Sequence, residues 1–203
     1  MKDAATRQRL LREAAYEFAR LGYDAASLRK IAERVGIRAA SVYGHFPDGK
    51  AQLYDEILAT VSTTLTERIA RRYGQNTGLS AEDVIVQMCA AFWDFCQEYP
   101  NYATLLLRET FDADNSLLVG EIGPARQVVA GCIGYVEAAQ ARNELPALDV
   151  EAFSLWVASY MLTYHGAPGL RSNVQRRPWS PGRAREQFVA MVRNLLRGAM
   201  AGG

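Results

Sequence analysis

The sequence predicts an all-α protein. Apolar residues recur at helical spacing along most of the chain, and Gly and Pro residues separate segments that each have the length of one helix. No segment of length alternates apolar and polar residues with the period of two that a strand requires. With 203 residues, 49% of them hydrophobic, the chain can form one large domain or two small ones around a substantial core.

Three helices are expected in the N-terminal part of the chain. The first spans about residues 6–21 and ends at Gly22, where a left-handed backbone is expected. The second is residues 28–35, "LRKIAERV", and Gly36 after it permits the positive φ of a sharp turn. The third is the stretch 37–46, "IRAASVYGHF".

Six further helices are expected in the rest of the chain. Their predicted ranges are 50–73, 81–99, 102–111, 124–141, 150–164 and 183–199. The helix at 150–164 is apolar on nearly all sides, which predicts burial on two sides. The segment 165–182 contains Arg171, Arg176 and Arg177 and is longer than a bundle connection needs, so we expect a loop that is mobile or covers another part of the molecule.

Composition excludes several classes of protein. No apolar run approaches the roughly 20 residues that span a bilayer, and the N-terminus lacks a hydrophobic signal segment, so we expect a cytoplasmic protein with no membrane partner. Cys89, Cys96 and Cys132 have no CxxC spacing, and His45 and His165 are the only histidines, so neither disulfides nor a metal site are expected. Buried structural thiols are the expected role of the cysteines; a redox sensor at the first two is the alternative.

Catalytic motifs are missing from the sequence. It contains no phosphate-binding loop, no G-x-S-x-G and no H-E-x-x-H. The segment "DADNS" at 112–116 resembles part of a calcium loop but lacks its glycine and its closing glutamate, which favours a solvated loop. We therefore expect no enzymatic activity and no cofactor.

The charge distribution and the turn between the second and third helices indicate a function. Residues 1–50 hold 10 Lys/Arg against 6 Asp/Glu, whereas the remaining residues hold 13 against 16, so a basic head precedes a mildly acidic body. Two short helices joined by a tight glycine turn are typical of a helix-turn-helix, whose second helix enters the DNA major groove. An ordinary helical hairpin remains the alternative on this pattern alone.

The stretch "FARLGYDAASLRKIAERVGIRAASVYGHFPDGKAQLYDEIL", residues 18–58, resembles the DNA-binding head of the TetR family of transcriptional regulators. The resemblance is carried by the aromatic and Gly-Tyr ending the first helix, Ser-Leu-x-x-Ile-Ala in the second, the Gly-Ile turn, Tyr-x-His-Phe in the third and the lysine opening the fourth. It implies a helix-turn-helix DNA-binding domain over residues 1–48 and a helical effector-binding and dimerisation domain over 49–203.

The resemblance also implies a set of DNA-binding residues. Tyr43, His45 and Lys50 are expected to reach phosphates, and Ser27 and Arg29 to hold the backbone from the second helix. Base reading is expected from the third helix, through Arg38, Ala39, Ser41 and Gly44. Because this helix offers few hydrogen-bond donors, recognition is expected to depend partly on DNA shape.

Two positions depart from the family pattern. Arg38 stands where a Ser or Thr usually caps the third helix, and a guanidinium cannot accept that hydrogen bond. Lys50 follows Phe46 by four residues where three is commoner, which is expected to shift its amine relative to the phosphate.

The body carries no motif of its own, and the family resemblance supplies its expected role. It implies an apolar small-molecule pocket, and a homodimer formed through the helices at 150–164 and 183–199. The candidate pocket residues are Phe92, Trp93, Cys96, Tyr102, Leu106, Glu109, Phe111, Tyr135, Trp156, Tyr160 and Tyr164. Ordinary core packing is the alternative for each of them.

The function expected from the sequence is therefore a ligand-responsive transcriptional regulator, acting as a repressor. It would bind a palindromic double-stranded DNA operator as a homodimer and be released by an apolar or aromatic small molecule. A ligand-independent DNA-binding or architectural protein with the same head is the alternative, and an enclosed cavity in the body would favour the first interpretation.

Overall fold

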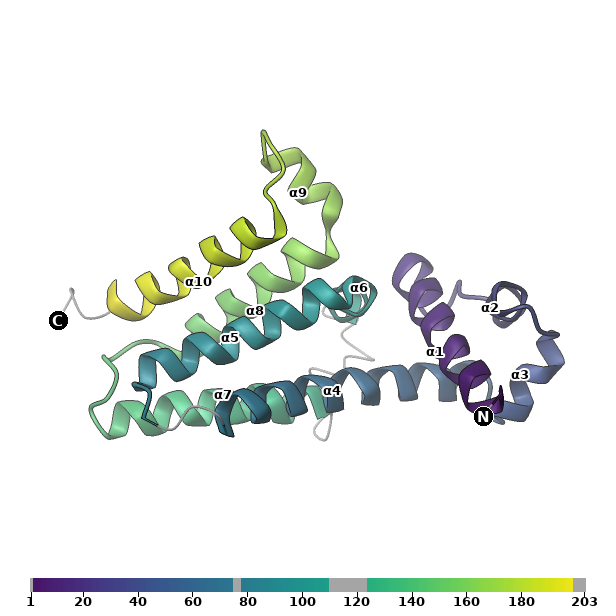
Figure 1. Cartoon of the computed structure of the whole chain (residues 1–203), viewed down its shortest axis with the longest axis horizontal. Coiled ribbons are helices and arrows are strands. Elements are labelled where there is room, and N and C mark those ends of the chain that lie inside the picture. Colours follow the sequence, from purple (N-terminus) through teal and green to yellow (C-terminus); the bar gives the residue numbers. More distant parts are fainter. Residues whose placement is uncertain (1, 75–77, 110–123, 199–203) are drawn as a thin grey trace.

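The computed structural model describes residues 2–74, 78–109 and 124–198, and every regular element within these ranges is an α-helix. Figure 1 shows their arrangement. The helices are α1 (Lys2–Leu21), α2 (Leu28–Val35), α3 (Ala39–His45), α4 (Lys50–Gly74), α5 (Ala81–Glu98), α6 (Pro100–Glu109), α7 (Pro124–Ala141), α8 (Val150–Gly166), α9 (Pro168–Val174) and α10 (Pro181–Gly198). The predicted all-α class is confirmed.

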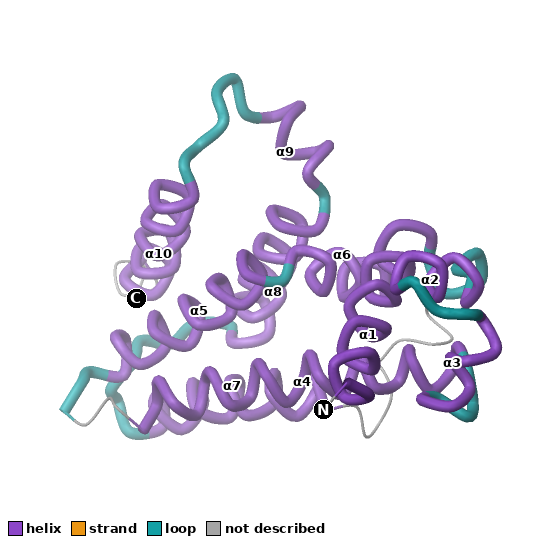
Figure 2. Tube along the Cα trace, turned by 45° about the vertical axis from the view of Figure 1, so that its right-hand side comes forward, coloured by secondary structure: helices purple, strands orange, loops and turns teal. Residues whose placement is uncertain are grey.

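A small head and a larger body are joined by the long helix α4. Figures 1 and 2 show α1, α2 and α3 together at one end of the molecule, with α4 leading from them into the body. In the body, α4 packs against α5 and α7, α8 packs against α5, α6 and α7, and α10 packs on α5. Helix α6 contacts α1 of the head as well as α8 of the body, so it forms a second connection between the two parts.

Three buried clusters hold these helices together. The first fills the head and includes Phe18, Ile31, Val42 and Phe46, and it extends to Leu105 of α6. The second joins α5, α7, α8 and α10 around a fully buried tryptophan, and the third joins α4, α5, α6 and α8. Because the first cluster includes a residue of α6, head and body share buried contacts beyond the covalent link through α4.

Local signals in the sequence correctly mark several helix ends. Gly22 and Gly36 have φ of 81° and 79°, as expected for left-handed helix stops. Ser80 caps α5 by accepting a hydrogen bond from the Asp83 N–H at 3.1 Å. At α10, Ser180 accepts one from the Arg183 N–H at 3.3 Å.

Some helix boundaries and one loop differ from the prediction. Helix α1 begins at Lys2, four residues earlier than expected, and the last expected residues of α6, including Phe111, lie outside the described ranges. The segment expected as a loop contains α9, which begins with Pro168 in its first turn and has no buried residue. So short an exposed helix leaves no periodic apolar pattern, which is why the sequence did not indicate it.

The structure also bears on the exclusions drawn from composition. Among the described helices, none has both the length and the apolar character needed to cross a bilayer. No three His, Cys, Asp or Glu side chains of residues 2–74, 78–109 and 124–198 gather as a metal site.

Candidate nucleic-acid interface and body cavity

Helix α3 is fixed to the head by its apolar side and presents the opposite side to solvent. Val42 and Phe46 are fully buried, as expected, and pack in the head core beside Ile31 and Val35 of α2. The turn that sets the angle between the helices is closed by the Gly36 N–H donating to the Glu33 carbonyl at 3.1 Å. This is the geometry of a helix-turn-helix with a short, accessible second helix.

Most of the predicted DNA-binding residues of this region are accessible. Arg38, Ser41 and Gly44 are exposed, and Tyr43 has 54% of its surface exposed, an unusual value for a large aromatic side chain. The Tyr43 ring rests over Gly49, where an added Cβ would lie 3.0 Å from Tyr43 Cε1. The ring is therefore oriented by the turn before α4, and its hydroxyl is available as a donor.

Ala39 differs from this pattern. It was expected to face outward with Arg38 and Ser41, but it is half-buried and packs against the head core. A methyl group in this position has less of its surface available to a thymine methyl than the prediction assumed.

Two predicted phosphate donors already have partners within the protein. His45 Nδ1 lies 3.1 Å from Asp3 Oδ1, and only 15% of the imidazole side chain is exposed. Lys50 Nζ donates to the backbone carbonyls of Tyr23 at 2.9 Å and Asp24 at 3.1 Å, and it lies 4.5 Å from the centre of the Tyr23 ring. A phosphate contact by either residue would add to, or replace, these internal bonds.

The capping positions of α2 and α3 leave polar groups free. Ser27 is the N-cap of α2 in extended conformation, but its side chain makes no capping hydrogen bond. Arg38 is the N-cap of α3 and, as expected for a guanidinium, makes none either. The exposed Arg29 has only a long contact with Glu33, at 3.8 Å between Nε and Oε1. No side chain therefore occupies the first N–H groups of α2, whereas at the start of α3 the Ser41 N–H already donates to the Arg38 carbonyl at 2.9 Å.

A buried carboxylate helps to hold α2 in place. Glu17 of α1 is fully buried and its Oε2 lies 2.9 Å from Arg34 NH1 of α2, although the geometry does not meet that of a hydrogen bond. Arg9 of α1 donates to the Val35 carbonyl at 2.9 Å. Sequence reasoning missed this link, because a buried glutamate has no local signature that separates it from a solvated one.

An apolar cavity lies inside the body. Its volume is about 130 Å³, and residues of α4, α5, α6, α7 and α8 line it. Ser62 and Ser154 are the only hydroxyl-bearing side chains among the described lining residues, the others being aliphatic, aromatic or sulfur-containing. The cavity therefore suits an apolar guest with at most one or two polar groups.

The candidate effector residues are distributed over several environments. Phe92 and Leu106 line the cavity, whereas Trp156, Tyr160 and Tyr164 line a wider groove on another side of α8. Trp93 and Cys96 are fully buried in the core, and Tyr102 and Tyr135 pack at the edges of the core clusters, so these four line neither space. Phe111 and the side chain of Glu109 lie outside what the structure describes.

The helix that the sequence predicted to be buried on two sides is α8. Val157, Met161 and Leu162 on one side of it line the cavity, and aromatic residues on another side line the groove. Most of the cavity lining consists of aliphatic residues from helical stripes, which the sequence could not separate from ordinary core.

Cys89 and Cys96 are buried and Cys132 is half-buried, and the pKa of each thiol is raised. Burial raises the pKa of the Cys89 thiol to about 12 and that of the Cys132 thiol to about 11, and it raises the pKa of Cys96 further. Because the thiolate is the reactive form, these groups are poor nucleophiles at neutral pH. This argues against the redox-sensor alternative.

Helix α6 links the cavity to the head. Leu106 lines the cavity, and two residues later Arg108 donates from Nε to the Ala19 carbonyl at 2.7 Å and from NH2 to the Arg20 carbonyl at 3.1 Å. These carbonyls belong to the last turn of α1, where a cation is favoured by the helix dipole. Nothing in the local sequence around Arg108 indicates this contact, since its partners lie nearly 90 residues earlier.

Comparison with known proteins supports the geometric interpretation. Residues 10–57 match the model of the bacterial regulatory proteins of the tetR family. A search of curated proteins gives no match.

Solved structures share the fold over nearly the whole chain. A tetR-family regulatory protein from Rhodococcus RHA1 is 16% identical with a TM-score of 0.73, covering 94% of this chain and 96% of its own. The TetR family regulator PfmR from Thermus thermophilus is 20% identical, with a TM-score of 0.70 and coverages of 94% and 95%. KstR2, a ketosteroid transcriptional regulator of Mycobacterium tuberculosis, is 19% identical, with a TM-score of 0.70 and 93% of each chain covered.

These similarities concern the head and the overall fold. The match in the head contains the helix-turn-helix described above, and the shared fold accounts for the body. The head, residues 10–57, therefore matches the model of the tetR-family regulatory proteins, and the chain as a whole has the fold of solved TetR-family regulators.

Proposed function

We propose that the protein is a ligand-responsive repressor that binds a palindromic operator as a homodimer and is released by a small apolar or aromatic molecule. The observation that carries this proposal is the double role of α6. Through Leu106 it borders the cavity, and through Arg108 it holds the C-terminal turn of α1. A guest that displaces α6 would therefore alter the position of the head.

The exposed side of α3 supports the DNA-binding part of the proposal. Tyr43 would donate to a phosphate, together with the uncapped N–H groups at the start of α2, and Ser27 and Arg29 would add contacts from α2. Arg38 would reach a guanine edge or a phosphate, and Ser41 a base edge of either kind. Gly44 allows close approach of the helix, and Ala39 contributes only its accessible part.

His45 and Lys50 are assigned a conditional role. Each is a cation or potential cation near the proposed DNA surface, but each is bound to groups of the head. Asp3 is 88% exposed in its side chain, so its contact with His45 is easily exchanged for a phosphate. Lys50 would have to leave two close carbonyls, so its share of the binding energy is expected to be smaller.

Exposed apolar residues on α8 and α10 support a homodimer. Leu155 of α8 has 69% of its surface exposed and Leu195 of α10 has 42%. A second copy packed against both helices would remove these groups from water. The two α3 helices of such a dimer would enter successive major grooves roughly 34 Å apart.

The small volume of the cavity suggests how a guest could act. A cavity of about 130 Å³ accepts a molecule on the order of benzene, which engineered cavities of about 150 Å³ are known to bind. A larger effector would have to separate the surrounding helices, including α4 and α6. It would then favour a different head position, and a coupling of about 1–3 kcal/mol changes DNA affinity roughly 5–150-fold.

The DNA-binding part is tested by selecting bound sequences from random duplex DNA and measuring affinity for the selected site. Tyr43→Phe should weaken binding to all sequences alike, and Arg38→Ala should also relax base preference. Lys50→Ala should have a smaller uniform effect, and Arg142→Ala, in the body, should have none. Affinity should fall steeply between low and physiological salt. Unchanged affinity in all three head variants, or a flat salt response, would contradict the assignment of this surface.

The ligand-responsive part is tested by screening small apolar and aromatic molecules for release of the selected DNA. Ala158 lines the cavity, so Ala158→Leu should fill part of it, keep DNA binding and lose the response. Release that is unaffected by this variant would place the effector elsewhere. A protein that binds DNA and responds to no such molecule would favour the ligand-independent alternative.

A further inference from the structure

The apolar cavity of the body is rich in sulfur. Four of its described lining residues carry a sulfur atom, namely Met88 and Cys89 of α5, Cys132 of α7 and Met161 of α8. Cys96, the third described cysteine, does not line it. Thiol and thioether sulfur atoms are soft, polarisable ligands that prefer soft elements to hard cations such as Mg²⁺ or Ca²⁺. The cavity therefore has a chemical property in addition to its apolar character.

The two thiols of the cavity come from neighbouring helices. Helices α5 and α7 pack together, and Cys89 belongs to the buried cluster that also contains Val136, one turn after Cys132 on α7. The pKa of the Cys89 thiol is raised by burial and also by the charge that Cys132 would carry, so the two groups lie near enough to interact electrostatically. Two thiols that line one small cavity from different helices can bind a single ligand together.

The α7 side of the cavity is within reach of solvent. Val129, which also lines the cavity, has 39% of its surface exposed, and Cys132 is half-buried, whereas Cys89 is buried. A ligand that enters on this side would meet the Cys132 thiol first and the Cys89 thiol deeper in the cavity.

The lining favours a ligand whose bound form carries no charge. No Lys, Arg, His, Asp or Glu is among the described lining residues, and Ser62 and Ser154 supply the only hydroxyl groups there. A charged complex would be costly in this place because no group of opposite charge compensates it. Two thiolates on Cu(I) would leave a net negative charge, and Zn²⁺ would need further ligands. Two thiolates on an arsenic(III) atom that carries one carbon substituent give a neutral product.

We propose that Cys89 and Cys132 together capture a trivalent organoarsenic compound whose apolar group, about the size of a phenyl ring, occupies the cavity. The arsenic atom of phenylarsonous acid, PhAs(OH)2, would form one bond to each sulfur atom and lose both hydroxyl groups, and each thiol proton would leave with one hydroxyl as water. Arsenic stays trivalent, so the reaction needs no oxidant or reductant. The cavity of about 130 Å³ suits the ring, since an engineered apolar cavity of about 150 Å³ binds benzene.

The protonated state of the thiols agrees with this chemistry. Burial raises the pKa of both groups, so at neutral pH they react poorly with oxidants and with electrophiles that require a thiolate. A hydroxyl group leaving the arsenic atom takes up the thiol proton, so no stable buried thiolate has to form. The cavity thereby favours capture of a soft ligand over oxidation.

This assignment rests on the proposed function, in which the cavity holds the effector, and it names a chemical class for that guest. A ligand bonded to both cysteines would tie α5 to α7, and α7 packs against α4, the helix that leads to the head. Capture itself can be measured without DNA, so the two proposals can fail separately.

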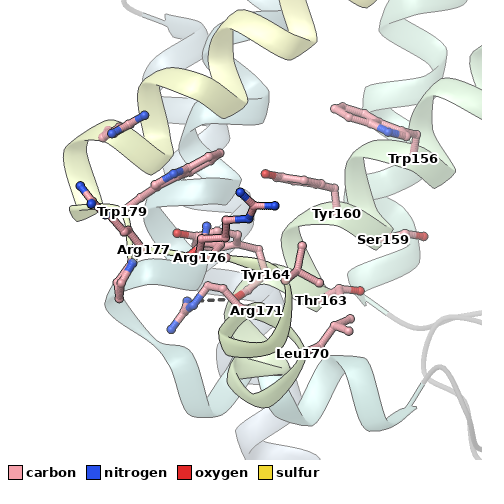
Figure 3. Close-up of a pocket in the computed structure, with 14 residues that line it drawn as sticks. Trp156, Ser159, Tyr160, Thr163, Tyr164, Leu170, Arg171, Arg176, Arg177 and Trp179 are labelled. Carbon is pink, nitrogen blue, oxygen red and sulfur yellow. Dashed lines mark hydrogen bonds between the residues drawn. The ribbon is translucent and has the colours of Figure 1, made fainter.

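The groove on another side of α8 is not expected to bind such a compound. It is bounded by α8, by α9 and by the connection to α10, and Figure 3 shows Tyr160 and Trp179 reaching into it from opposite sides. Four arginines, but neither Cys nor Met, are among its described lining residues. It also adjoins the helices assigned above to the homodimer contact, so a second copy of the chain would cover part of it.

The test uses the full-length protein, reduced and then freed of reductant, and two probes of similar size. Phenylarsine oxide, which hydrates to phenylarsonous acid in water, carries the soft element. Phenylboronic acid carries a hard element, boron, in the same position. Native mass spectrometry should show one phenylarsenic group bound per chain and no bound phenylboronic acid.

Variants of the cysteines locate the site. Cys132→Ala, at the half-buried position, and Cys89→Ala should each lower the affinity for phenylarsine oxide by about 10²–10⁴-fold, because the second bond is then no longer intramolecular. Cys96→Ala makes the same chemical change at a fully buried thiol outside the cavity and should leave the affinity unchanged. Ala158→Leu should weaken capture although all three thiols remain, since it fills space needed by the ring. Circular dichroism and thermal unfolding confirm that each variant is folded.

Three results would overturn the assignment of the thiols. They are equal binding of the two probes, an affinity that survives the loss of Cys89 or Cys132, and an affinity that depends equally on Cys96. Capture without release of the selected DNA would support the thiol site and contradict the role of the cavity as effector site. Release by other apolar molecules, blocked by Ala158→Leu, in a protein that captures no arsenic would support the proposed function and contradict the thiol site.

Discussion

Replacement of Gly166 by alanine should push α6 and α8 apart. Gly166 is the last residue of α8, and a Cβ added to it would lie 2.9 Å from the Ala103 carbonyl oxygen and 3.1 Å from Thr104 Cα. Both atoms belong to the backbone of α6, so no side-chain rotation can relieve the contact. Thr104 also donates from Oγ1 to the Gly166 carbonyl at 3.3 Å, which ties the helices together at the same point.

The expected cost follows from these distances. A carbon atom and a non-bonded oxygen or carbon atom are at their optimal separation at roughly 3.3–4.0 Å. Helix α6 must therefore move by about half an ångström. Forcing an extra methyl group into a packed site typically costs about 1–3 kcal/mol. This opposes the gain of up to about 1 kcal/mol that Gly→Ala gives in an unobstructed helix, and a net loss of about 1–2 kcal/mol is expected.

Gly131 provides the matched control. It lies within α7, and a Cβ added there meets no atom within 4 Å. Gly131→Ala should therefore stabilise the protein by up to about 1 kcal/mol. The two variants make the same chemical change and are expected to shift stability in opposite directions.

Urea unfolding followed by tryptophan fluorescence measures the difference. All three tryptophans, at 93, 156 and 179, lie in the body, and Trp93 packs 4.5 Å from the ring of His165, next to the substituted residue. The midpoint should fall for Gly166→Ala and rise for Gly131→Ala. A Gly166→Ala protein as stable as the Gly131→Ala protein would refute the inference that backbone contact limits this site.

Three other predictions concern polar groups. Arg108→Met removes two hydrogen bonds to the last turn of α1, and amide hydrogen exchange there should speed up by the equivalent of about 1–2 kcal/mol; unchanged protection would exclude the link between α6 and the head. The pKa of His165 falls from 6.5 in the unfolded chain to about 4 in the folded protein, so the unfolded chain binds more protons between these values. Stability should therefore be lost as the pH falls through this window, and His165→Phe should flatten that part of the curve; an identical slope in the variant would contradict the assignment. Glu17→Gln removes the buried partner of Arg34, whose side chain is 33% exposed and so partly solvated; hydrogen exchange in α1 and α2 should report a loss of stability of about 1–2 kcal/mol, and no change would mean that the pair is not stabilising.

Much of the fold and the exposure of part of the proposed DNA-binding surface were predictable because their signals are local. Gly36 stands where only a residue tolerant of positive φ fits, and the apolar spacing of α3 distinguishes the inward Val42 and Phe46 from the outward Tyr43. Such signals need no knowledge of distant residues. The same reasoning failed for Ala39, because a half-buried methyl depends on how closely the neighbouring helix approaches.

The candidate ligand sites were less predictable. The sequence indicated one aromatic pocket, whereas the structure has an aliphatic cavity and an aromatic, arginine-rich groove on different sides of α8. An apolar helix has several faces, and only the positions of its neighbours decide which face encloses a space. For the same reason α9, which forms one wall of the groove, could not be recognised from its own residues.

The sequence by itself determined the helical class, the turn between α2 and α3 and the family resemblance of the head, because these depend on backbone preferences and on spacing within a few turns. Only the tertiary structure decided that Lys50 is held by the carbonyls of Tyr23 and Asp24, and that Arg108 joins α6 to α1. These contacts connect residues 26 or more positions apart. Their hydrogen-bond energies depend on distances of a few tenths of an ångström, which the packing of whole helices sets and no local pattern encodes.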